Sequence, residues 1–411
     1  MTDPGAQQMP DPARQRESVG AVFLAFLQLG FTAFGGPVAH LGYFREAFVV
    51  RRGWIDDKAY ADLVALCQFL PGPASSQVGI GIGLARAGLP GACAAWFAFT
   101  MPSALALVVF GYAVSAFEGA IASGALHGLK VIAVAVVAQA VWGMARSLTP
   151  DAPRITLAVL AAAAVLAMPT PLVQVAVIAA GGVAGLTCLP AALDERRVAL
   201  GIAVPRGLAV GALVVFFVLL AGLPLLAVAY PSQALALIDS FYRSGALVFG
   251  GGHVVLPLLQ SEVVPPGWIG NDAFLAGYGA AQAVPGPLFT FAAYLGTVAA
   301  PAPNGWLGGL ICLLAIFVPS FLLVIGALPF WDRLRHLRLV QKALLGVNAA
   351  VVGLLLAALY RPVWTSGVLS AADFALALAA FTLLVFWKLP AWLVVLLTAA
   401  AGWGLHMLGA A

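Results

Sequence analysis

The sequence GFTAFGGP at residues 30–37 decides the fold, because it returns later in the chain as GALVFGGG at residues 245–252. Three further motifs return in the same order after 214 to 217 residues. They are a Gly-Trp-Ile turn (53–55 and 267–269), a Pro-Gly-Pro motif (71–73 and 285–287) and a Pro-Ser pair (102–103 and 319–320). Four matches in register indicate that the chain is a duplication.

The composition places both copies in a lipid bilayer. Of the 411 residues, 63% are hydrophobic and 9% are charged, against about 25% charged in soluble domains. So few charges cannot cover a water-soluble surface, whereas a bilayer requires apolar helices of about 20 residues. The apolar stretches are continuous and do not alternate with polar residues, which excludes a transmembrane barrel. The sequence therefore predicts an all-α polytopic membrane protein.

Polar interruptions divide the chain into five parts. We expect a polar N-terminal tail, a first transporter repeat, a basic linker, a connecting transmembrane helix and a second transporter repeat; these cover residues 1–18, 19–190, 191–206, 207–230 and 241–408. Duplicated halves with interrupted hydrophobic segments at matching places are typical of secondary transporters. The four cysteines form no CxxC pair, so we expect neither a metal site nor a cofactor.

The charges of equivalent loops predict that the two repeats have opposite orientations. The loop after the first glycine motif holds Arg45, Arg51, Arg52 and Lys58, whereas its counterpart holds Glu262 and Asp272 and no cation. The bias reverses between the basic loop at 332–342 and its counterpart at 118–130. Because cations prefer cytoplasmic loops, this pattern indicates inverted repeats with the N-terminus in the cytoplasm.

Parity of crossing then requires some segments to be re-entrant. Residues 63–70 and 74–87 are each too short to span about 30 Å as helices, and they flank Pro71-Gly72-Pro73. We therefore expect a hairpin broken at this motif, and a glycine-motif segment that is re-entrant or sharply broken. Four full helices per repeat and the connecting helix give about nine crossings, or up to about 13 membrane segments if the broken ones also span.

These motifs resemble one known family. The glycine motifs at 34–37 and 249–253, the Gly-Trp turns, both Pro-Gly-Pro motifs, both Pro-Ser pairs and the run Leu345–Gly353 are similar to those of the chromate ion transporters of the ChrA type. The resemblance covers both halves. It implies a bacterial inner-membrane protein that exports chromate from the cytoplasm, with sulfate as the chemically similar anion.

The Pro-Gly-Pro motifs are the first candidate anion sites. Proline removes a backbone donor and breaks the helix, so free N–H groups follow each break, and in a bilayer such groups survive only against protein or a cavity. The N-terminus of the next half-helix then favours an oxyanion. Kinks needed only for packing are the alternative. The candidate residues are Pro71, Gly72, Pro73, Ala74, Ser75, Ser76, Pro285, Gly286, Pro287 and Thr290.

Further candidates lie near these breaks, and each has a structural alternative. The glycines would let backbone approach a ligand or another helix; they are Gly35, Gly36, Gly250, Gly251 and Gly252. Arg86 and Arg243 suit a dianion but lie near span ends, where snorkelling is common. Polar candidates that could orient the ligand, satisfy freed carbonyls or bond across an interface are Gln68, Gln282, His253 and Asn348.

Energetics favours export over uptake. Expelling a dianion from a negative interior gains about 4.6 kcal/mol at 100 mV, so proton coupling is not required. The alternatives left open are a sulfate or other oxyanion permease and a membrane scaffold without transport. HExxH, GxSxG and paired catalytic carboxylates are absent, so we expect no catalytic residues and no enzyme. Small oxyanions and lipid are the expected partners, nucleic acid is not, and a homodimer stays open.

Overall fold

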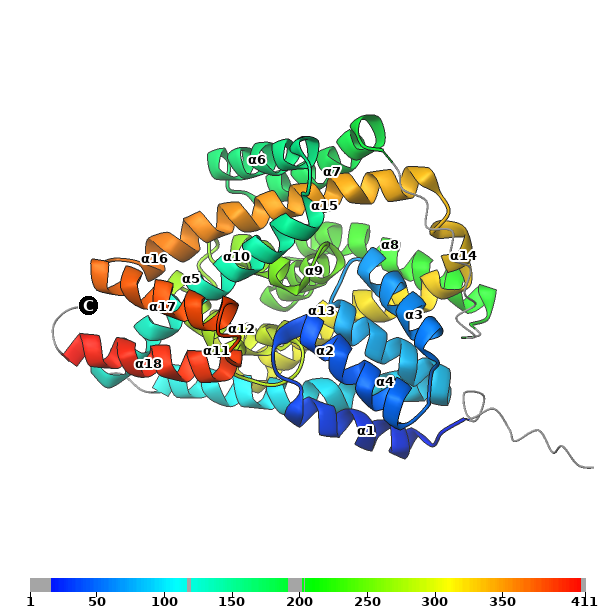
Figure 1. Cartoon of the computed structure of the whole chain (residues 1–411), viewed down its shortest axis with the longest axis horizontal. Coiled ribbons are helices and arrows are strands. Elements are labelled where there is room, and N and C mark those ends of the chain that lie inside the picture. Colours follow the sequence, from blue (N-terminus) through cyan, green and yellow to red (C-terminus); the bar gives the residue numbers. More distant parts are fainter. Residues whose placement is uncertain (1–15, 117–119, 191–201, 203, 408–411) are drawn as a thin grey trace, which may run out of the picture.

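Helices form all the regular structure in the part of the chain that the computed structural model describes, which is residues 16–116, 120–190, 202 and 204–407. Most of the predicted tail and linker, and Glu118, lie outside these residues. Figure 1 shows several long helices, among them α4 and α15, running along or at a modest angle to the horizontal axis of the view. The predicted all-α architecture is confirmed.

The order of elements in the first half is repeated in the second. The first half contains α1 (Val19–Thr32), α2 (Gly36–Phe44) with the π-helix η2 (Arg45–Arg51), α3 (Asp57–Phe69), α4 (Ala74–Ala116), α5 (Ala120–Leu148), α6 (Ala152–Ala167) and α7 (Pro171–Cys188). Helix α8 (Arg206–Ala229) connects the halves.

The second half is divided more finely. It contains α9 (Gln233–Ala246), η3 (Gly252–Val254), α10 (Val255–Val263), α11 (Asn271–Ala281), η4 (Leu288–Thr290), α12 (Phe291–Val298), α13 (Gly305–Ala327), η5 (Leu328–Phe330), α14 (Trp331–Leu334), α15 (Arg338–Ala358), η6 (Leu359–Trp364), α16 (Thr365–Gly367), α17 (Ala371–Val385) and α18 (Ala391–Met407). Helix α4 contains an internal break at Ala87 and Gly88, where the backbone leaves helical geometry. Its two parts therefore correspond to α12 and α13.

The four short helices of the first half form two hairpins that open on the same side. Arg86 ends the second hairpin, and its carbonyl accepts a hydrogen bond of 3.0 Å from the amide of Glu17, just before α1. The Arg86 guanidinium donates to the carbonyl of Trp54, which follows the first hairpin, at 3.2 Å. The 13 residues of α3 extend only about 20 Å. Both hairpins therefore enter and leave on one side, as re-entrant segments.

The hairpins of the second half open on the opposite side. The carbonyl of Trp268, after α10, accepts a hydrogen bond of 2.9 Å from the amide of Ala300, after α12. Helix α11 begins beside the N-terminal half of α5, where Asp272 pairs with Lys130 at 3.2 Å. At the other end of the molecule, Asp62 of α3 pairs with Arg335 at 2.8 Å. Equivalent helices thus begin on opposite sides, and the repeats are inverted.

The two sides also differ in charge. We call the side that carries Arg45, Arg51, Arg52 and Lys58 the basic face. The basic loop at 332–342 belongs to this face through the ion pair of Arg335 with Asp62, and α3 and α14 lie together in Figure 1. The far face is the opposite side, where α11 begins.

The described helices include both long and shorter apolar segments. Six of them are long and apolar enough to cross a membrane: Ala74–Ala116, Gly124–Leu148, Pro171–Cys188, Arg206–Ala229, Gly305–Leu334 and Arg338–Gly367. Helices α6, α17 and α18 are shorter, with 16, 15 and 17 residues, and stand where further crossings were predicted. The described chain therefore holds six helices long enough to cross a membrane and these three shorter apolar helices, besides the re-entrant hairpins.

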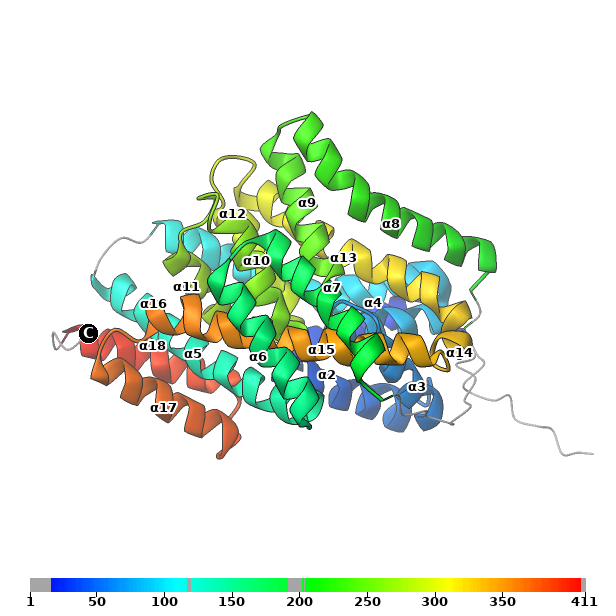
Figure 2. The ribbon, with the colours of Figure 1, turned by 90° about the horizontal axis from the view of Figure 1, so that it is seen from above.

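Close glycine contacts join the two repeats. Helices α6 and α7 pack on α15 of the other repeat, and α18 packs on α5 (Figure 1 and Figure 2). A Cβ atom on Gly185 would collide with the backbone oxygen of Lys342, and one on Gly128 would collide with that of Thr398. Because backbone cannot retreat as a side chain can, these helices approach this closely only with glycine.

This packing predicts that Gly185→Ala destabilises the protein. The added methyl overpacks the contact between α7 and α15 and should cost about 1–3 kcal/mol, lowering the melting temperature of the detergent-solubilised protein. Gly222→Ala is the matched control, since nothing lies within 4 Å of a Cβ at this position in α8. Equal melting temperatures for the two variants would contradict the packing.

Candidate functional site

The four broken helices are joined in pairs by crossed backbone hydrogen bonds. In the first Pro-Gly-Pro motif, the amide of Gly72 donates to the carbonyl of Val248 at 2.7 Å. In the second, the amide of Gly286 donates to the carbonyl of Ala33 at 2.9 Å. Ala33 and Val248 are equivalent residues just before the two glycine motifs. Each Pro-Gly-Pro break is therefore held by the glycine break of the other repeat.

The Pro-Ser pairs close the same contacts from the side. A Cβ on Gly72 would lie 3.0 Å from the Oγ of Ser320, and a Cβ on Gly286 would lie 2.8 Å from the Oγ of Ser103. Both serines are fully buried. The two glycines also have φ angles of 121° and 91°, which disfavour any side chain. A Pro-Gly-Pro motif of one repeat thus meets the glycine motif and the Pro-Ser pair of the other repeat, and this happens twice.

A large cavity lies beside this junction and has a volume of about 720 Å³. Residues from both repeats line it. Those predicted from the sequence are Gly35, Gln68, Gly72, Ala74, Gly250, Gly251, Gly252, His253 and Asn348. The remaining lining residues are Pro37, Leu41, Cys67, Leu70, Gln139, Ala140, Gly143, Met144, Ser147 and Leu148. We call this space the central cavity.

The lining of the central cavity is polar in part but carries no formal charge, since its polar side chains are those of Gln68, Gln139, Ser147, His253 and Asn348. The ring of His253 is oriented by a hydrogen bond of 2.7 Å between its Nδ1 and the hydroxyl of Tyr278. Such neutral groups can hold a small anion by hydrogen bonds.

Backbone amides add to these side chains. The amides of Gly250, Gly251 and Gly252 have no hydrogen-bond acceptor among the described residues. Gly250 and Gly251 have φ angles of 74° and 148°. Successive amides in such turns form concavities that bind anions.

Both predicted arginines lie outside the central cavity and have carboxylate partners. Arg86 is 3% exposed and pairs with Glu17 at 3.6 Å. Arg243 pairs with both Asp239 and Glu262 at 2.9 Å. Their guanidinium groups join segments of the fold on the two faces.

The other predicted residues surround the junction without lining the central cavity. Ser75 contacts the ring of His40 at 3.4 Å, and Gln282 donates to the carbonyl of Tyr278 at 3.4 Å. Thr290 donates to the carbonyl of Pro287 at 2.8 Å. Also absent from the lining are Gly36, Pro71, Pro73, Ser76, Pro285 and Gly286. The first Pro-Gly-Pro motif therefore reaches the cavity and the second does not.

Sequence reasoning missed the wall that α5 contributes. Gln139, Gly143 and Ser147 are four residues apart and share one helix face, and Met144 lies beside them. This stretch has no short motif that recurs with conserved residues in the second half, and its hydropathy predicts only an apolar span. The available signal was a small and polar stripe within an otherwise apolar helix.

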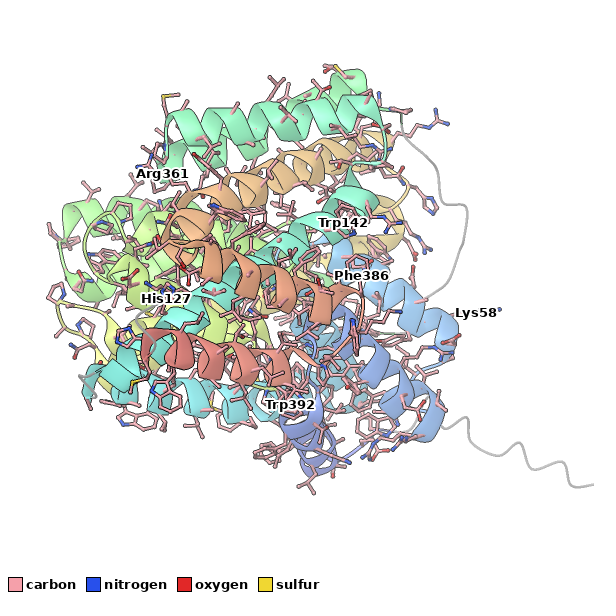
Figure 3. The ribbon with its side chains drawn as sticks, turned by 60° about the vertical axis from the view of Figure 1, so that its left-hand side comes forward. Lys58, His127, Trp142, Arg361, Phe386 and Trp392 are labelled. Atoms are coloured by element: carbon pink, nitrogen blue, oxygen red, sulfur yellow. The ribbon has the colours of Figure 1, made fainter. Side chains whose placement is uncertain are left out.

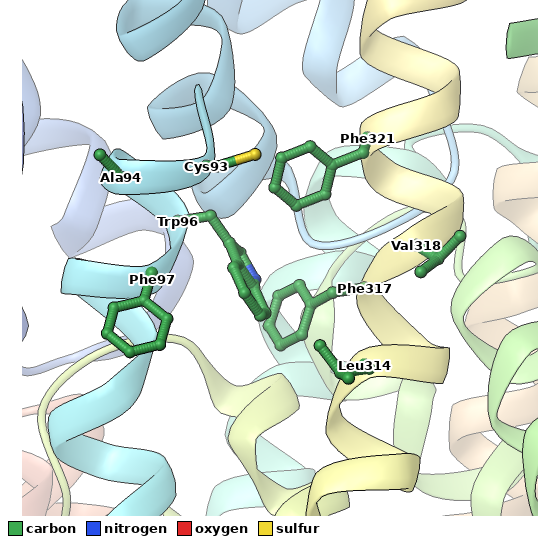
Figure 4. Close-up of a pocket in the computed structure, with 8 residues that line it drawn as sticks. All are labelled: Cys93, Ala94, Trp96, Phe97, Leu314, Phe317, Val318 and Phe321. Atoms are coloured by element: carbon green, nitrogen blue, oxygen red, sulfur yellow. The ribbon is translucent and has the colours of Figure 1, made fainter. Parts of the chain in front are cut away.

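A different cavity, between α4 and α13, has a mainly apolar lining. Its volume is about 440 Å³, and it is lined by Cys93, Ala94, Trp96, Phe97, Leu314, Phe317, Val318 and Phe321. Figure 4 shows the ring of Trp96 close to that of Phe317, and their centroids are 5.5 Å apart. This apolar space does not suit an oxyanion.

Comparison with known proteins identifies the family. The model of the family described as chromate transporter matches residues 20–186 and 235–403, one segment in each repeat. The chain belongs to the chromate transporter family. This family assignment confirms the resemblance drawn from the motifs.

Relatives of this chromate transporter family member cover most of its length. A chromate transport protein of Pseudomonas aeruginosa is 28% identical over 359 residues, which are 86% of this chain and 82% of the relative. An uncharacterized transporter of Methanocaldococcus jannaschii is 27% identical over 85% of both chains. A probable chromate transport protein of Synechococcus elongatus is 26% identical over 80% of both. No solved structure matches the chain.

The crossed junction predicts an energetic coupling between Gly72 and Ser320. Gly72→Ala should lower the melting temperature, because the methyl group strains a φ of 121° and crowds Ser320. Adding Ser320→Ala removes the hydroxyl and should restore part of the loss, which a double-mutant cycle would measure as coupling. Gly53→Ala is the control for backbone strain alone, since its Cβ would meet no atom within 4 Å. Strict additivity of Gly72→Ala and Ser320→Ala would argue against the contact.

Proposed function

We propose that the protein exports chromate from the cytoplasm through the central cavity and thereby confers chromate resistance. The observation that carries the proposal is the convergence of broken helices from both inverted repeats on one polar, uncharged cavity. Secondary transporters bind substrate at such repeat interfaces, on discontinuous helices. Membership of the chromate transporter family supports the choice of substrate.

The chemistry of the cavity suits a transported oxyanion. Gln68 and Asn348 supply amide donors, His253 supplies a ring, and the glycine turn at 250–252 supplies backbone amides. These groups replace part of the hydration shell of a compact dianion. A site without a full positive charge binds less tightly than an arginine clamp, and binding in a pathway must be weak enough to permit release.

The direction follows from charge and potential. We assign the basic face to the cytoplasm by the positive-inside rule, which places the start of α1 on the cytoplasmic side of the bacterial inner membrane. A dianion that leaves a negative interior gains about 4.6 kcal/mol at 100 mV. This energy supports an outward gradient of roughly three decades, so membrane potential can drive export without coupling.

Sulfate is the expected competitor, because it is also a compact tetrahedral dianion and the cavity offers no group that separates the two. If the protein is coupled to protons, the cluster of Asp239, Arg243 and Glu262 is the candidate, since two carboxylates share one cation there. A sulfate permease on the same scaffold is the second candidate function. A membrane scaffold without transport activity is the least favoured candidate function.

Removing the cavity's amides should impair transport. In everted membrane vesicles, Gln68→Leu and Asn348→Leu should each lower the initial rate of chromate uptake about 10-fold or more, since a lost hydrogen bond to a charged group is worth about 1.5–3 kcal/mol. Gln28→Leu is the matched control, because Gln28 is exposed on α1 outside the cavity. Normal uptake by both cavity variants, at normal protein levels, would sink the assignment of the site.

Whole cells test the direction. Cells that express the protein should accumulate less chromate than cells without it, and added sulfate should compete with chromate for uptake into everted vesicles. Equal or greater chromate accumulation in the expressing cells would favour the permease over the exporter. The quantity measured is the total chromium content per cell at matched growth.

A further inference from the structure

A second polar cavity, of about 350 Å³, opens beside η6 at the end of α15. It lies between the turn that joins α6 to α7, helix α10, and the segment from α15 to α16. Its polar lining residues are Gln174, Gln260, Ser261, Asn271, Arg361, Thr365 and Ser366. Asn271 begins α11, and its side-chain amide donates to the hydroxyl of Ser366 at 2.8 Å, which places this cavity at the far face.

The internal repeat relates this second cavity to the central one. Gly128 on α5 and Gly346 on α15 occupy equivalent places, because each meets a helix of the other repeat at a backbone contact that excludes a side chain. They are 218 residues apart. The same spacing assigns each residue of the α5 wall of the central cavity to a counterpart in the second repeat. The wall residues are Gln139, Ala140, Gly143, Met144, Ser147 and Leu148. Their counterparts, in the same order, are Ala357, Ala358, Arg361, Pro362, Thr365 and Ser366. All six counterparts line the second cavity.

One substitution changes the chemistry of the repeated wall. Arg361 stands where the first repeat has Gly143, so a guanidinium enters a cavity whose counterpart has no charge. Arg361 is exposed and makes no hydrogen bond or ion pair with any other described residue. Figure 3 places Arg361 and Lys58, which marks the basic face, toward opposite sides of the molecule. Guanidinium binds tetrahedral oxyanions through two parallel hydrogen bonds.

Unpaired buried groups also line this space. Gln174 is 4% exposed, and its amide nitrogen donates to the carbonyl of Pro257 at 3.3 Å. Its Oε1 and the Oδ1 of Asn271 are buried without a hydrogen-bond partner in the described chain. A buried acceptor without a donor is costly. Water in the cavity, including the hydration shell of an anion held by Arg361, would supply the missing donors.

We propose that the second cavity is an oxyanion-binding vestibule on the release side, in which Arg361 binds the dianion after it leaves the central cavity. The inference rests on the proposed function for the identity of the anion. The two repeat-related cavities then form two stations of one route, a neutral central cavity and a cationic vestibule at the far face. Because the interior of the cell is negative, the membrane potential does not drive an anion from the release side back into the cytoplasm.

Protection of an engineered cysteine tests the vestibule directly. In a variant with Cys67, Cys93, Cys188 and Cys312 replaced by serine or alanine, Thr365→Cys places an exposed thiol in the cavity wall. Intact cells are labelled with a membrane-impermeant maleimide in sulfate or in chloride at equal ionic strength. Sulfate is the probe, because chromate oxidises thiols. Sulfate at twice its Kd should slow labelling about threefold.

Arg361 variants and a second reporter make the outcome decisive. Arg361→Gln should abolish protection by sulfate, Arg361→Lys should keep part of it, and the control Arg338→Gln, at the start of α15 outside both cavities, should keep all of it. Gln260→Cys replaces the reporter if Thr365→Cys does not reach the membrane. Absence of labelling from outside, or equal protection with Arg361→Gln, would overturn the proposal. Protection that follows the anionic lipid content of vesicles and ignores sulfate would assign Arg361 to a lipid headgroup, and would overturn it also.

The same cells separate this inference from the proposed function. Chromate accumulation is measured alongside labelling in the Gln68→Leu and Asn348→Leu variants. Sulfate protection at residue 365 with no effect of these variants on accumulation leaves the vestibule standing and removes the central cavity as the route. Impaired export in these variants without protection at residue 365 removes only the vestibule.

Discussion

The crossed pair of backbone hydrogen bonds, from Gly72 to Val248 and from Gly286 to Ala33, is the constraint on which the rest of the structure depends. A helix broken inside a bilayer exposes amides and carbonyls that lipid cannot satisfy. Each repeat therefore completes the broken helices of the other. Neither half can form its re-entrant hairpins alone without leaving these groups unpaired, which explains why the two repeats are so closely interlocked.

The inverted duplication relates the second cavity to the central cavity, and divergence explains why the two differ. The wall from α5 offers Gln139 and Ser147, whereas the equivalent wall offers Ala357, Arg361 and Thr365. A symmetric pair of cavities would hold an anion equally well at both ends. Among these changes, the one from Gly143 to Arg361 adds a charge and makes the two cavities of the proposed route chemically distinct.

The tertiary structure pairs two arginines that the sequence suggests for anion binding with carboxylates instead. Arg86 and Arg243 are suited by type to an oxyanion, yet carboxylates on neighbouring segments bind both. A buried guanidinium needs such partners because its desolvation is costly. Arg361 lies in a polar cavity without a carboxylate partner among the described residues, and a residue with no motif around it becomes the stronger candidate.

The sequence by itself determined the helical class, the two repeats, their opposite orientation and the positions of the four breaks, because hydropathy, loop charge and proline act locally and repeat visibly along the chain. It also singled out the glycine turn at 250–252, Gln68 and His253, which stand in or beside repeated motifs, and Asn348, which stands in the run Leu345–Gly353; all of them line the central cavity. Only the tertiary structure decided that the amide of Gly72 is already paired and that α5 forms a wall of the central cavity. The physical reason is that hydrogen-bond partners and cavity walls come from segments more than 60 residues apart in the chain, and no local pattern records which of them meet.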